Sequence, residues 1–414
     1  MRLFFSFHSI LMIAMFICSD VFSAEYSFFG KTDKENPLTY QPGETMIFEV
    51  EFRQNGKPVD GQKLFWKRRG DDEIIEQGEA ISSSSEPLRI KTSLAIPGFV
   101  HVMVWAEGID GWDDVRFNGG AGVNVDQIEG YPEPEDFDAF WIQQKKRLSQ
   151  IPLRYDLVPV PSEEPSVEVF DVKVDCLGKS VSGYFCKPKN AAEKSLPAYV
   201  SFHGYGVGSA NIKYEQGQKM LAFDINAHGI ENGQPNSYYQ NLRDNELKSY
   251  GLIPEGNIDR ETCYWNGMVL RILRALEFIK SQKEWDGKTL IVTGGSQGGF
   301  QCLVAAALDH DVSECVAHVP WLADLSGKEI HHRIPSIDAP SWTPALGYYD
   351  TANHAKRIQC KTTIYAGLGD YDCPPSGQFV MFNSMKAPRT LEFRQGKTHG
   401  FTMPGGTVTT LDFP

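Results

Sequence analysis

The chain has 414 residues and carries 53 acidic against 40 basic side chains, which gives a formal net charge of −13 at pH 7. This excess of acidic groups argues against nucleic acid or an anionic membrane surface as a partner and favours neutral substrates. The length exceeds what a single domain of ordinary size needs, so we expect more than one domain.

Residues 1–24 have the pattern of a secretory signal peptide, with an early arginine, an apolar stretch centred on residues 10–17 and small residues just before Glu25. The apolar stretch is too short to predict a membrane span. Phe22 is bulky where cleavage sites prefer small residues, which keeps an uncleaved membrane anchor as the alternative. We therefore predict a secreted or periplasmic protein.

Residues 25–128 show a two-residue hydrophobic period interrupted by turns. Apolar and polar residues alternate over 47–52 and again over 100–105, and Asn55-Gly56 is typical of a tight hairpin turn. Several short strands at such spacing predict a small β-sandwich domain of immunoglobulin-like type.

Two tryptophans of this region, Trp66 and Trp105, allow two interpretations. Flat aromatic faces stack on sugar rings, so either side chain is a candidate contact for polysaccharide. Large aromatic side chains more often belong to a hydrophobic core, and we favour that packing role, or a contact between subunits.

Residues 129–414 form the second predicted domain. Prolines at 132 and 134 stiffen a hinge over residues 130–134, and a helix is expected from Glu135. Strand-like runs then alternate with helical ones, including an amphipathic helix over 257–280 with Arg271 on its outer face. This alternation predicts an α/β domain with a doubly wound, mostly parallel sheet.

A nucleophile elbow is the most specific motif in this domain. The β-branched run 289–292 leads into Thr-Gly-Gly-Ser-Gln-Gly-Gly at 293–299, and small apolar residues follow at 302–307. Strand, sharp turn and helix in this order hold the serine of Gly-x-Ser-x-Gly in a strained backbone at a strand end. Ser296 is therefore the candidate nucleophile.

A histidine base and an orienting carboxylate follow the serine in the order typical of α/β-hydrolases. The predicted strand 361–367 leads to Asp370, and the predicted strand 390–394 leads to His399. Both residues come after strands, where ligand chemistry occurs in open α/β sheets. Asp372 is the competing carboxylate, but we favour Asp370 because it is the first after the strand.

Two backbone N–H groups are needed to stabilise an oxyanion. The residue after the serine, Gln297, supplies one candidate. The buried strand predicted over 196–202 leads to His203-Gly204-Tyr205, a loop like the His-Gly-Gly-Gly loop of esterases, which makes the Tyr205 N–H the second. His203 itself is expected to be structural.

These motifs resemble a known family, the acetyl xylan esterase and cephalosporin C deacetylase group of the α/β-hydrolases, carbohydrate esterase family 7. Its elbow Gly-Gly-Ser-Gln-Gly-Gly stands here at 294–299, its His-Gly-Tyr loop at 203–205, and its Gly-Leu-x-Asp-x-x-Cys-Pro-Pro-Ser loop at 367–376. The resemblance covers about the last two thirds of the chain. It implies a triad of Ser296, Asp370 and His399.

The chain departs from the family pattern at two places. The segment that reads Asp-x-Arg-Gly-Gln-Gly in the family is Asp-Ile-Asn-Ala-His-Gly at 224–229, so Asn226 and His228 stand in place of arginine and glutamine. Without the guanidinium, the loop that it braces must be held differently. His399 is followed by Gly400 instead of the family's usual glutamate.

Cysteine and histidine spacing predicts neither a metal site nor a cofactor. Of eight cysteines, Cys18 lies in the predicted signal peptide, and seven remain. An odd number cannot pair completely. Cys176 and Cys186 flank a possible hairpin and are the one pair to test for a disulfide.

We therefore expect a secreted serine esterase that removes acetyl groups from acetylated xylan, xylo-oligosaccharides or related small esters through an acyl-enzyme. Family members are often trimer-based, so a homo-oligomer is possible. One alternative is a serine peptidase of prolyl oligopeptidase type, but its propeller needs several hundred residues and about a hundred precede the catalytic domain. The other is a non-catalytic polysaccharide-binding protein.

Overall fold

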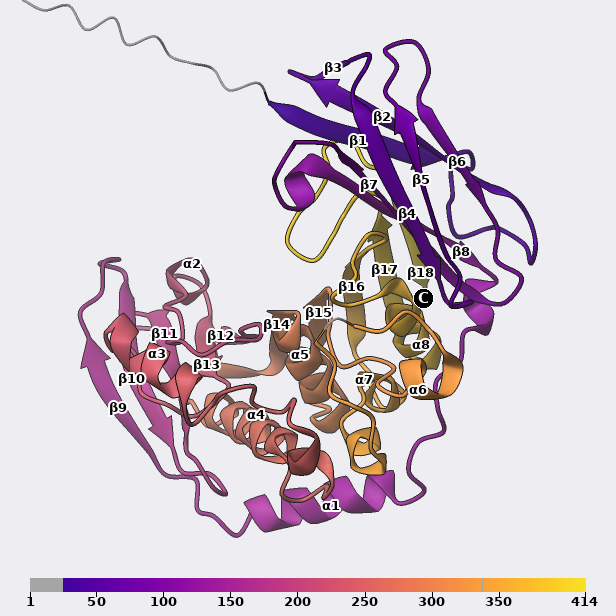
Figure 1. The fold of residues 1–414 in the computed structure, drawn as a ribbon. Helices are drawn as coiled ribbons and strands as arrows, with labels where there is room; N and C mark the ends of the chain where they lie inside the picture. Colours follow the sequence, from indigo (N-terminus) through magenta and orange to yellow (C-terminus); the bar gives the residue numbers. More distant parts are fainter. Residues whose placement is uncertain (1–24, 337) are drawn as a thin grey trace, which may run out of the picture.

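The computed structural model describes residues 25–336 and 338–414. The predicted signal peptide, residues 1–24, lies outside the described residues. A region of β-strands stands at one end of a larger α/β body (Figure 1).

The N-terminal region contains two antiparallel four-stranded sheets that enclose a common core, and we call residues 26–123 the sandwich. The first sheet contains β1 (Tyr26–Thr32), β2 (Met46–Gln54), β3 (Lys57–Pro58) and β6 (Leu88–Thr92). The second runs in the order β5 (Ile75–Ile81), β4 (Lys63–Gly70), β7 (Gly98–Ala106), β8 (Arg116–Val123). Phe48 of the first sheet and Val102 of the second lie in the same buried cluster.

The predicted hairpin turn is confirmed. Asn55 and Gly56 join β2 to β3 with positive φ angles of 50° and 76°, the backbone that a two-residue turn of this type requires. The proposed domain bounds of 25–128 and 129–414 stay a prediction.

The α/β body is built on one ten-stranded sheet. Its order is β18 (Val408–Phe413), β17 (Arg389–Arg394), β16 (Lys361–Gly367), β15 (Glu314–His318), β14 (Trp285–Gly295), β12 (Leu196–Phe202), β13 (Leu221–Asn226), β11 (Val181–Pro188), β10 (Val167–Val174) and β9 (Tyr155–Val160). The strands from β13 to β17 pair in parallel, and both margins of the sheet are antiparallel. The predicted mostly parallel sheet is confirmed.

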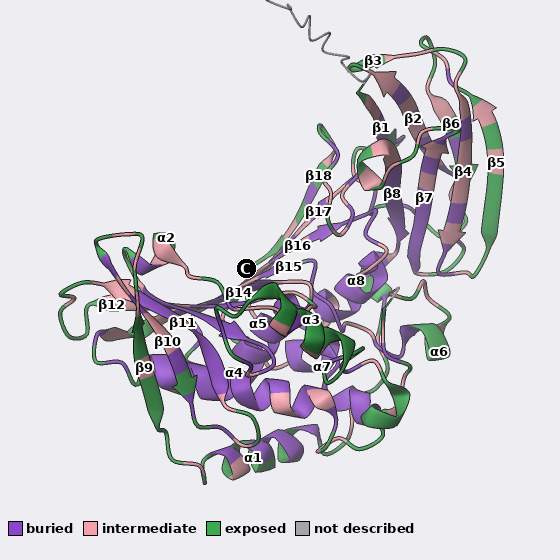
Figure 2. Cartoon of the chain, turned by 60° about the vertical axis from the view of Figure 1, so that its left-hand side comes forward, coloured by how far each residue is buried: buried purple, intermediate pink, exposed green. Residues whose placement is uncertain are grey.

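Helices bury most of one face of this sheet (Figure 2). The α-helices are α1 (Phe137–Leu148), α2 (Tyr214–Gly217), α3 (Asn236–Asp244), α4 (Tyr264–Lys280), α5 (Gln297–Leu308), α6 (Gly327–His331), α7 (Thr351–Ala355) and α8 (Pro375–Ser384). The described residues also form short 3₁₀ helices, η1 (Asp113–Val115), η2 (Val125–Gln127), η3 (Pro254–Asn257) and η4 (Pro344–Tyr348). Within the described residues, no helix has the length and apolar character needed to cross a membrane.

Side-chain alternation along β10 shows how the core is divided. Val172 and Val174 join the large cluster of the helical face, whereas Val167 and Val169 join a small cluster next to α2. Because successive strand residues point to opposite faces, the two clusters lie on opposite sides of the sheet.

Three details of the sequence interpretation are wrong. The helix predicted over 257–280 begins only at Tyr264, because the Asp259 carboxylate accepts the N–H groups of residues 261 and 262 and forms a turn instead. The helix expected from Glu135 begins at Phe137. Arg271, placed on the outer face, is buried.

The suggested disulfide does not form, and all seven described cysteines are free thiols. The hairpin register places Cys186 opposite Val169, near the start of β10. Cys176 lies beyond the end of β10, in the connection to β11. Cys176 therefore lies at the turn of the hairpin, whereas Cys186 lies toward its open end.

Candidate active site

Ser296 stands at the junction between β14 and α5. Its backbone has φ 56° and ψ −119°, a conformation that non-glycine residues rarely adopt. A Cβ atom on Gly298 would lie 2.2 Å from the Phe202 carbonyl oxygen, and one on Gly294 would lie 2.3 Å from the Gly298 backbone. The two flanking glycines therefore let strand and helix approach closely enough to form this turn.

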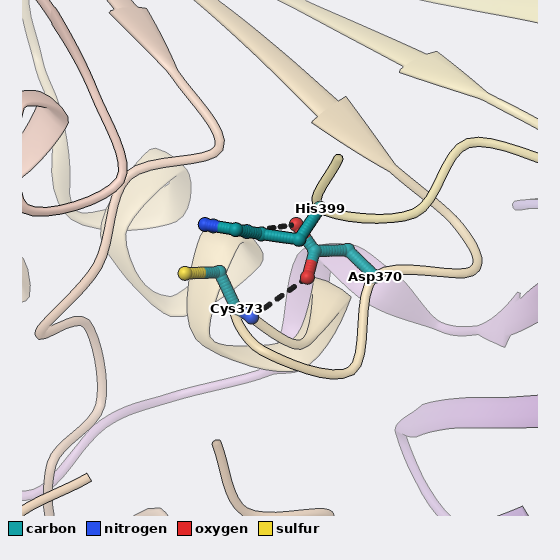
Figure 3. Close-up of side chains that lie close together, drawn as sticks. All are labelled: Asp370, Cys373 and His399. Atoms are coloured by element: carbon teal, nitrogen blue, oxygen red, sulfur yellow. Dashed lines mark hydrogen bonds and ion pairs between the residues drawn. The ribbon is translucent and has the colours of Figure 1, made fainter. Parts of the chain in front are cut away.

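Asp370 and His399 meet at the carboxyl ends of β16 and β17. Asp370 lies in residues 368–374, here called the acid loop, and His399 lies in residues 395–407, the histidine loop. The Nδ1 atom of His399 is 3.0 Å from Oδ2 of the buried Asp370 (Figure 3). The other ring nitrogen points away from the carboxylate.

The charge around His399 favours its protonated form. Burial alone would lower the pKa of His399, but the hydrogen bond and charge of Asp370, together with the charge of Asp372, raise it above its ordinary value. Lys397 opposes this effect. The hydrogen bond goes to Asp370, the carboxylate that the sequence favours over Asp372.

The Asp370 side chain also bonds to the backbone of its own loop. Oδ1 of Asp370 accepts the N–H groups of Asp372 at 3.0 Å and Cys373 at 2.8 Å. Asp370, Cys373 and His399 each offer one atom that could bind a metal ion, and these three atoms lie within 4.8 Å of one another (Figure 3). Burial raises the pKa of the Cys373 thiol well above its ordinary value, so the thiol is an uncharged packing group. The predicted absence of a metal stays a prediction.

The predicted nucleophile and base both lie at the edge of the sheet where the parallel strands end. Among the described residues, no hydrogen bond joins Ser296 Oγ to His399. Such bonds are often long in proteins without substrate and shorten when substrate binds.

The predicted oxyanion loop adjoins the elbow. A Cβ atom on Gly204 would lie 3.7 Å from Cβ of Ser296. The N–H groups of Tyr205 and Gln297 donate no hydrogen bond within the described part of the chain. Gln297 is the first residue of α5, where backbone N–H groups have no partner in the helix.

A buried polar network connects the two predicted oxyanion donors. His228 Nε2 lies 2.8 Å from the Gly206 carbonyl oxygen, and its Nδ1 meets the Tyr264 hydroxyl. The Tyr250 hydroxyl accepts the Gly206 N–H at 2.8 Å and donates to Oε1 of Gln297 at 2.9 Å. Burial lowers the pKa of His228 to about 3. The neutral ring therefore donates through Nε2 and accepts through Nδ1.

Two further side chains, Asn226 and Arg271, hold the backbone of this region. Asn226 Nδ2 donates to the Gly208 carbonyl at 2.6 Å, and its side-chain oxygen accepts the His228 N–H. The buried Arg271 donates to the Ala227 carbonyl through Nε at 2.9 Å and a terminal nitrogen at 2.6 Å. The sequence offered no signal for Tyr250 or Arg271, because both come from distant segments.

A pocket of about 310 Å³ lies beside the acid loop. Its walls include Trp321 and Arg333 from the segment after β15, Cys373 from the acid loop, and Arg69 from the sandwich. The backbone N–H of Trp321 donates a hydrogen bond to the Ser296 carbonyl, so this wall of the pocket is bonded to the elbow. The sandwich thus contributes to the surroundings of the site.

The profile of the acetyl xylan esterase (AXE1) family matches residues 125–331 and 341–409, well over half of the chain. The chain belongs to this family. As a member of the acetyl xylan esterase family with an α/β-hydrolase fold, it is a carboxylic ester hydrolase.

Similar proteins agree with this assignment. The chain is 25% identical over 370 residues to the acetyl esterase Axe7A of Xylanibacter ruminicola, covering 84% of this chain and 82% of that protein. The acetyl xylan esterase of Paenibacillus sp. R4 superposes with a TM-score of 0.57 and 27% identity, over 67% of this chain and 93% of that one. Acetyl xylan esterase 1 of Thermoanaerobacterium sp. supports the fold alone, with a TM-score of 0.55 and 22% identity over 68% and 93% of the two chains.

Exchange of Asp370 for asparagine is expected to lower kcat by about 10⁴-fold, because the amide no longer holds the required tautomer and does not stabilise the imidazolium. Steady-state hydrolysis of a nitrophenyl acetate measures this effect. Asp372→Asn is the matched control and should cost far less. Equal losses in the two variants would contradict the assignment of Asp370.

Exchange of His228 for alanine removes the donor to the Gly206 carbonyl and should lower kcat by up to about 10²-fold with little change in KM. His228→Gln, which restores the family's residue and an amide donor, should recover much of the loss. His354 provides the control, because it too is fully buried and contacts a backbone carbonyl, that of Tyr348, through Nε2 at 3.1 Å. Equal kcat losses in His228→Ala and His354→Ala would show that His228 acts through stability alone.

Proposed function

We propose that the protein is a secreted serine esterase that removes acetyl groups from acetylated xylan, xylo-oligosaccharides or related small esters. The observation that carries this proposal is the His399–Asp370 hydrogen bond at the same sheet edge as the strained Ser296, in a member of the acetyl xylan esterase family. The acidic net charge agrees with a neutral substrate.

The first half of the reaction forms an acyl-enzyme. Nε2 of His399 accepts the Ser296 hydroxyl proton while Oγ attacks the ester carbonyl carbon. The N–H groups of Tyr205 and Gln297 stabilise the oxyanion of the tetrahedral intermediate. When this intermediate collapses, the bond to the sugar oxygen breaks, and His399 returns the proton to that oxygen.

The second half releases the acid. His399 accepts a proton from water as the water oxygen attacks the acyl carbon, and the new tetrahedral intermediate expels Ser296 Oγ, which recovers its proton from His399. Asp370 keeps the imidazole in the tautomer with hydrogen on Nδ1 and stabilises the imidazolium. No step requires a cofactor.

The names of two relatives, an acetyl esterase and an acetyl xylan esterase, support an acetyl ester as the substrate and, less directly, xylan as the molecule that carries it. An exposed tryptophan supports a saccharide further. Trp112 is 79% exposed, and the next residue, Asp113, accepts the Tyr371 hydroxyl of the acid loop at 3.2 Å. The short helix η1 that follows Trp112 lies beside the histidine loop (Figures 1 and 2). Trp66 and Trp105, the two candidates from the sequence, are half-buried instead.

Acetate release from acetylated xylo-oligosaccharides tests the proposal, with nitrophenyl esters of increasing chain length and a chromogenic prolyl peptide as competing substrates. We expect rapid acetate release that falls as the acyl chain lengthens, and its loss in Ser296→Ala. Ser195→Ala, at an exposed serine, is the control. Peptide cleavage without ester hydrolysis, glycan binding alone, or activity unchanged in Ser296→Ala would overturn the proposal.

Exchange of Trp112 for alanine should lower kcat/KM on acetylated xylo-oligosaccharides by about tenfold through a higher KM, because the sugar loses the flat aromatic ring on which it would stack. Hydrolysis of nitrophenyl acetate should not change, since this small ester does not reach that far. Ile142→Ala, at an exposed apolar residue of α1, is the matched control. A Trp112 variant with unchanged KM on the oligosaccharides would exclude this contact.

A further inference from the structure

We propose that the sandwich is a working part of the active site, in which Asp71 and Gln395 are positioning residues that hold the acid loop and the histidine loop in place. This inference rests on the proposed function, because it assigns a role to the surroundings of the proposed triad. The family profile begins at residue 125, so the sandwich lies outside the part of the chain that the family profile matches.

Asp71 connects the sandwich to the end of the acid loop. It follows β4 and is almost completely buried. Its Oδ2 accepts the Ser376 hydroxyl at 2.6 Å and the Phe99 N–H at 2.7 Å, and its Oδ1 accepts the Ile334 N–H at 2.9 Å. Ser376 lies in the first turn of α8, directly after the acid loop. One carboxylate thus joins the sandwich, the start of α8 and a wall of the pocket.

Gln395 connects the sandwich to the histidine loop. Its buried side-chain amide donates to the Gly120 carbonyl at 2.9 Å and accepts the Gly120 N–H at 2.9 Å. Gly120 belongs to β8, the last strand of its sheet, whose outer backbone groups need partners. The amide supplies both partners, as a further strand would. Gln395 is the first residue of the loop that carries His399.

The backbones of the two parts also touch. A Cβ atom on Gly120 would lie 2.5 Å from the Leu368 carbonyl oxygen, and one on Gly369 would lie 2.2 Å from the Asn118 carbonyl oxygen. Leu368 and Gly369 directly precede Asp370. Only glycine permits this approach, so β8 lies against the segment that sets the position of the predicted acid.

Each part inserts an apolar side chain into the core of the other. Phe99 of β7 packs against Phe379 of α8 and Phe393 of β17, with ring centroids 5.4 Å and 6.2 Å apart. Met403 of the histidine loop is buried in the sandwich cluster. Such mutual insertion opposes sliding between the two parts, because either displacement would leave a cavity.

The experiment compares Asp71→Ala and Gln395→Leu with Phe48→Leu, a substitution in the sandwich core that removes none of the hydrogen bonds between the sandwich and the two loops. We expect the first two variants to lose at least tenfold in kcat on nitrophenyl acetate, with KM within about twofold. The control should lose stability but little kcat. Asp71→Asn, which retains one carbonyl acceptor, should have an intermediate effect and serves if Asp71→Ala does not fold.

A second readout follows the charge on His399. The groups that face it are Asp370, Asp372 and Lys397, and the two carboxylates raise its pKa. Either variant should increase the distance between Asp370 and His399. The carboxylate then raises the pKa of His399 less, so this pKa should fall in both variants. The base acts when neutral, and therefore the acid limb of the pH–rate profile should move to lower pH. NMR titration of the His399 ring measures this pKa without any substrate.

Labelling with a fluorophosphonate separates the two proposals, because Ser296 Oγ displaces fluoride from phosphorus whatever the natural ester is. A wild-type protein that labels but hydrolyses no acetyl ester overturns the substrate, and the labelling rates of the variants still test positioning. A wild-type protein that neither labels nor hydrolyses esters overturns the proposed function, and the His399 titration still reports on the loops. Variants with wild-type kcat, labelling rate and His399 pKa would overturn the positioning role.

Discussion

The close approach of helix α5 to strands β14 and β12 is the constraint on which the rest of the site depends. The Phe202 carbonyl occupies the space that a side chain at Gly298 would need, and the turn between β14 and α5 leaves Ser296 in a rare backbone conformation. A residue held in this way stays strained only because the surrounding core determines its position. The same packing brings the end of β12, and with it the loop 203–206, beside the serine.

Around this junction, the two sides of the candidate site are held by different means. The oxyanion side is stabilised within the α/β body chiefly by His228 and Tyr250, which bond to the backbone of Gly206 and to the side chains of Tyr264 and Gln297 respectively. Such a network is strong in a buried setting because no water competes for its partners. In this chain the network fixes the loop that follows β12.

The acid–base side lies in two loops whose partners come from the sandwich. Loops of this length are usually the most mobile part of an α/β fold. Here β8 lies along one of them and an amide from the other completes the edge of β8. The sandwich, which precedes the α/β body in sequence, is therefore continuous with it in space. This arrangement differs from a module joined only by a linker, since each part contributes to the other's core.

The sequence by itself determined the local helices and strands and the order in which the candidate nucleophile, acid and base follow along the chain. The strand over 196–202 and the strand over 361–367 have the bounds that the residues predict, and Ser296, Asp370 and His399 could be named because glycine spacing and strand ends have local signatures. Only the tertiary structure decided which groups surround them. Many residues of chain separate several buried polar side chains from their partners, namely Tyr250, Arg271, Asp71 and Gln395. Arg271 was wrongly placed at the surface because helical periodicity does not reveal a distant carbonyl. Local patterns encode backbone conformation, whereas the partners of a buried polar group depend on how separate segments pack.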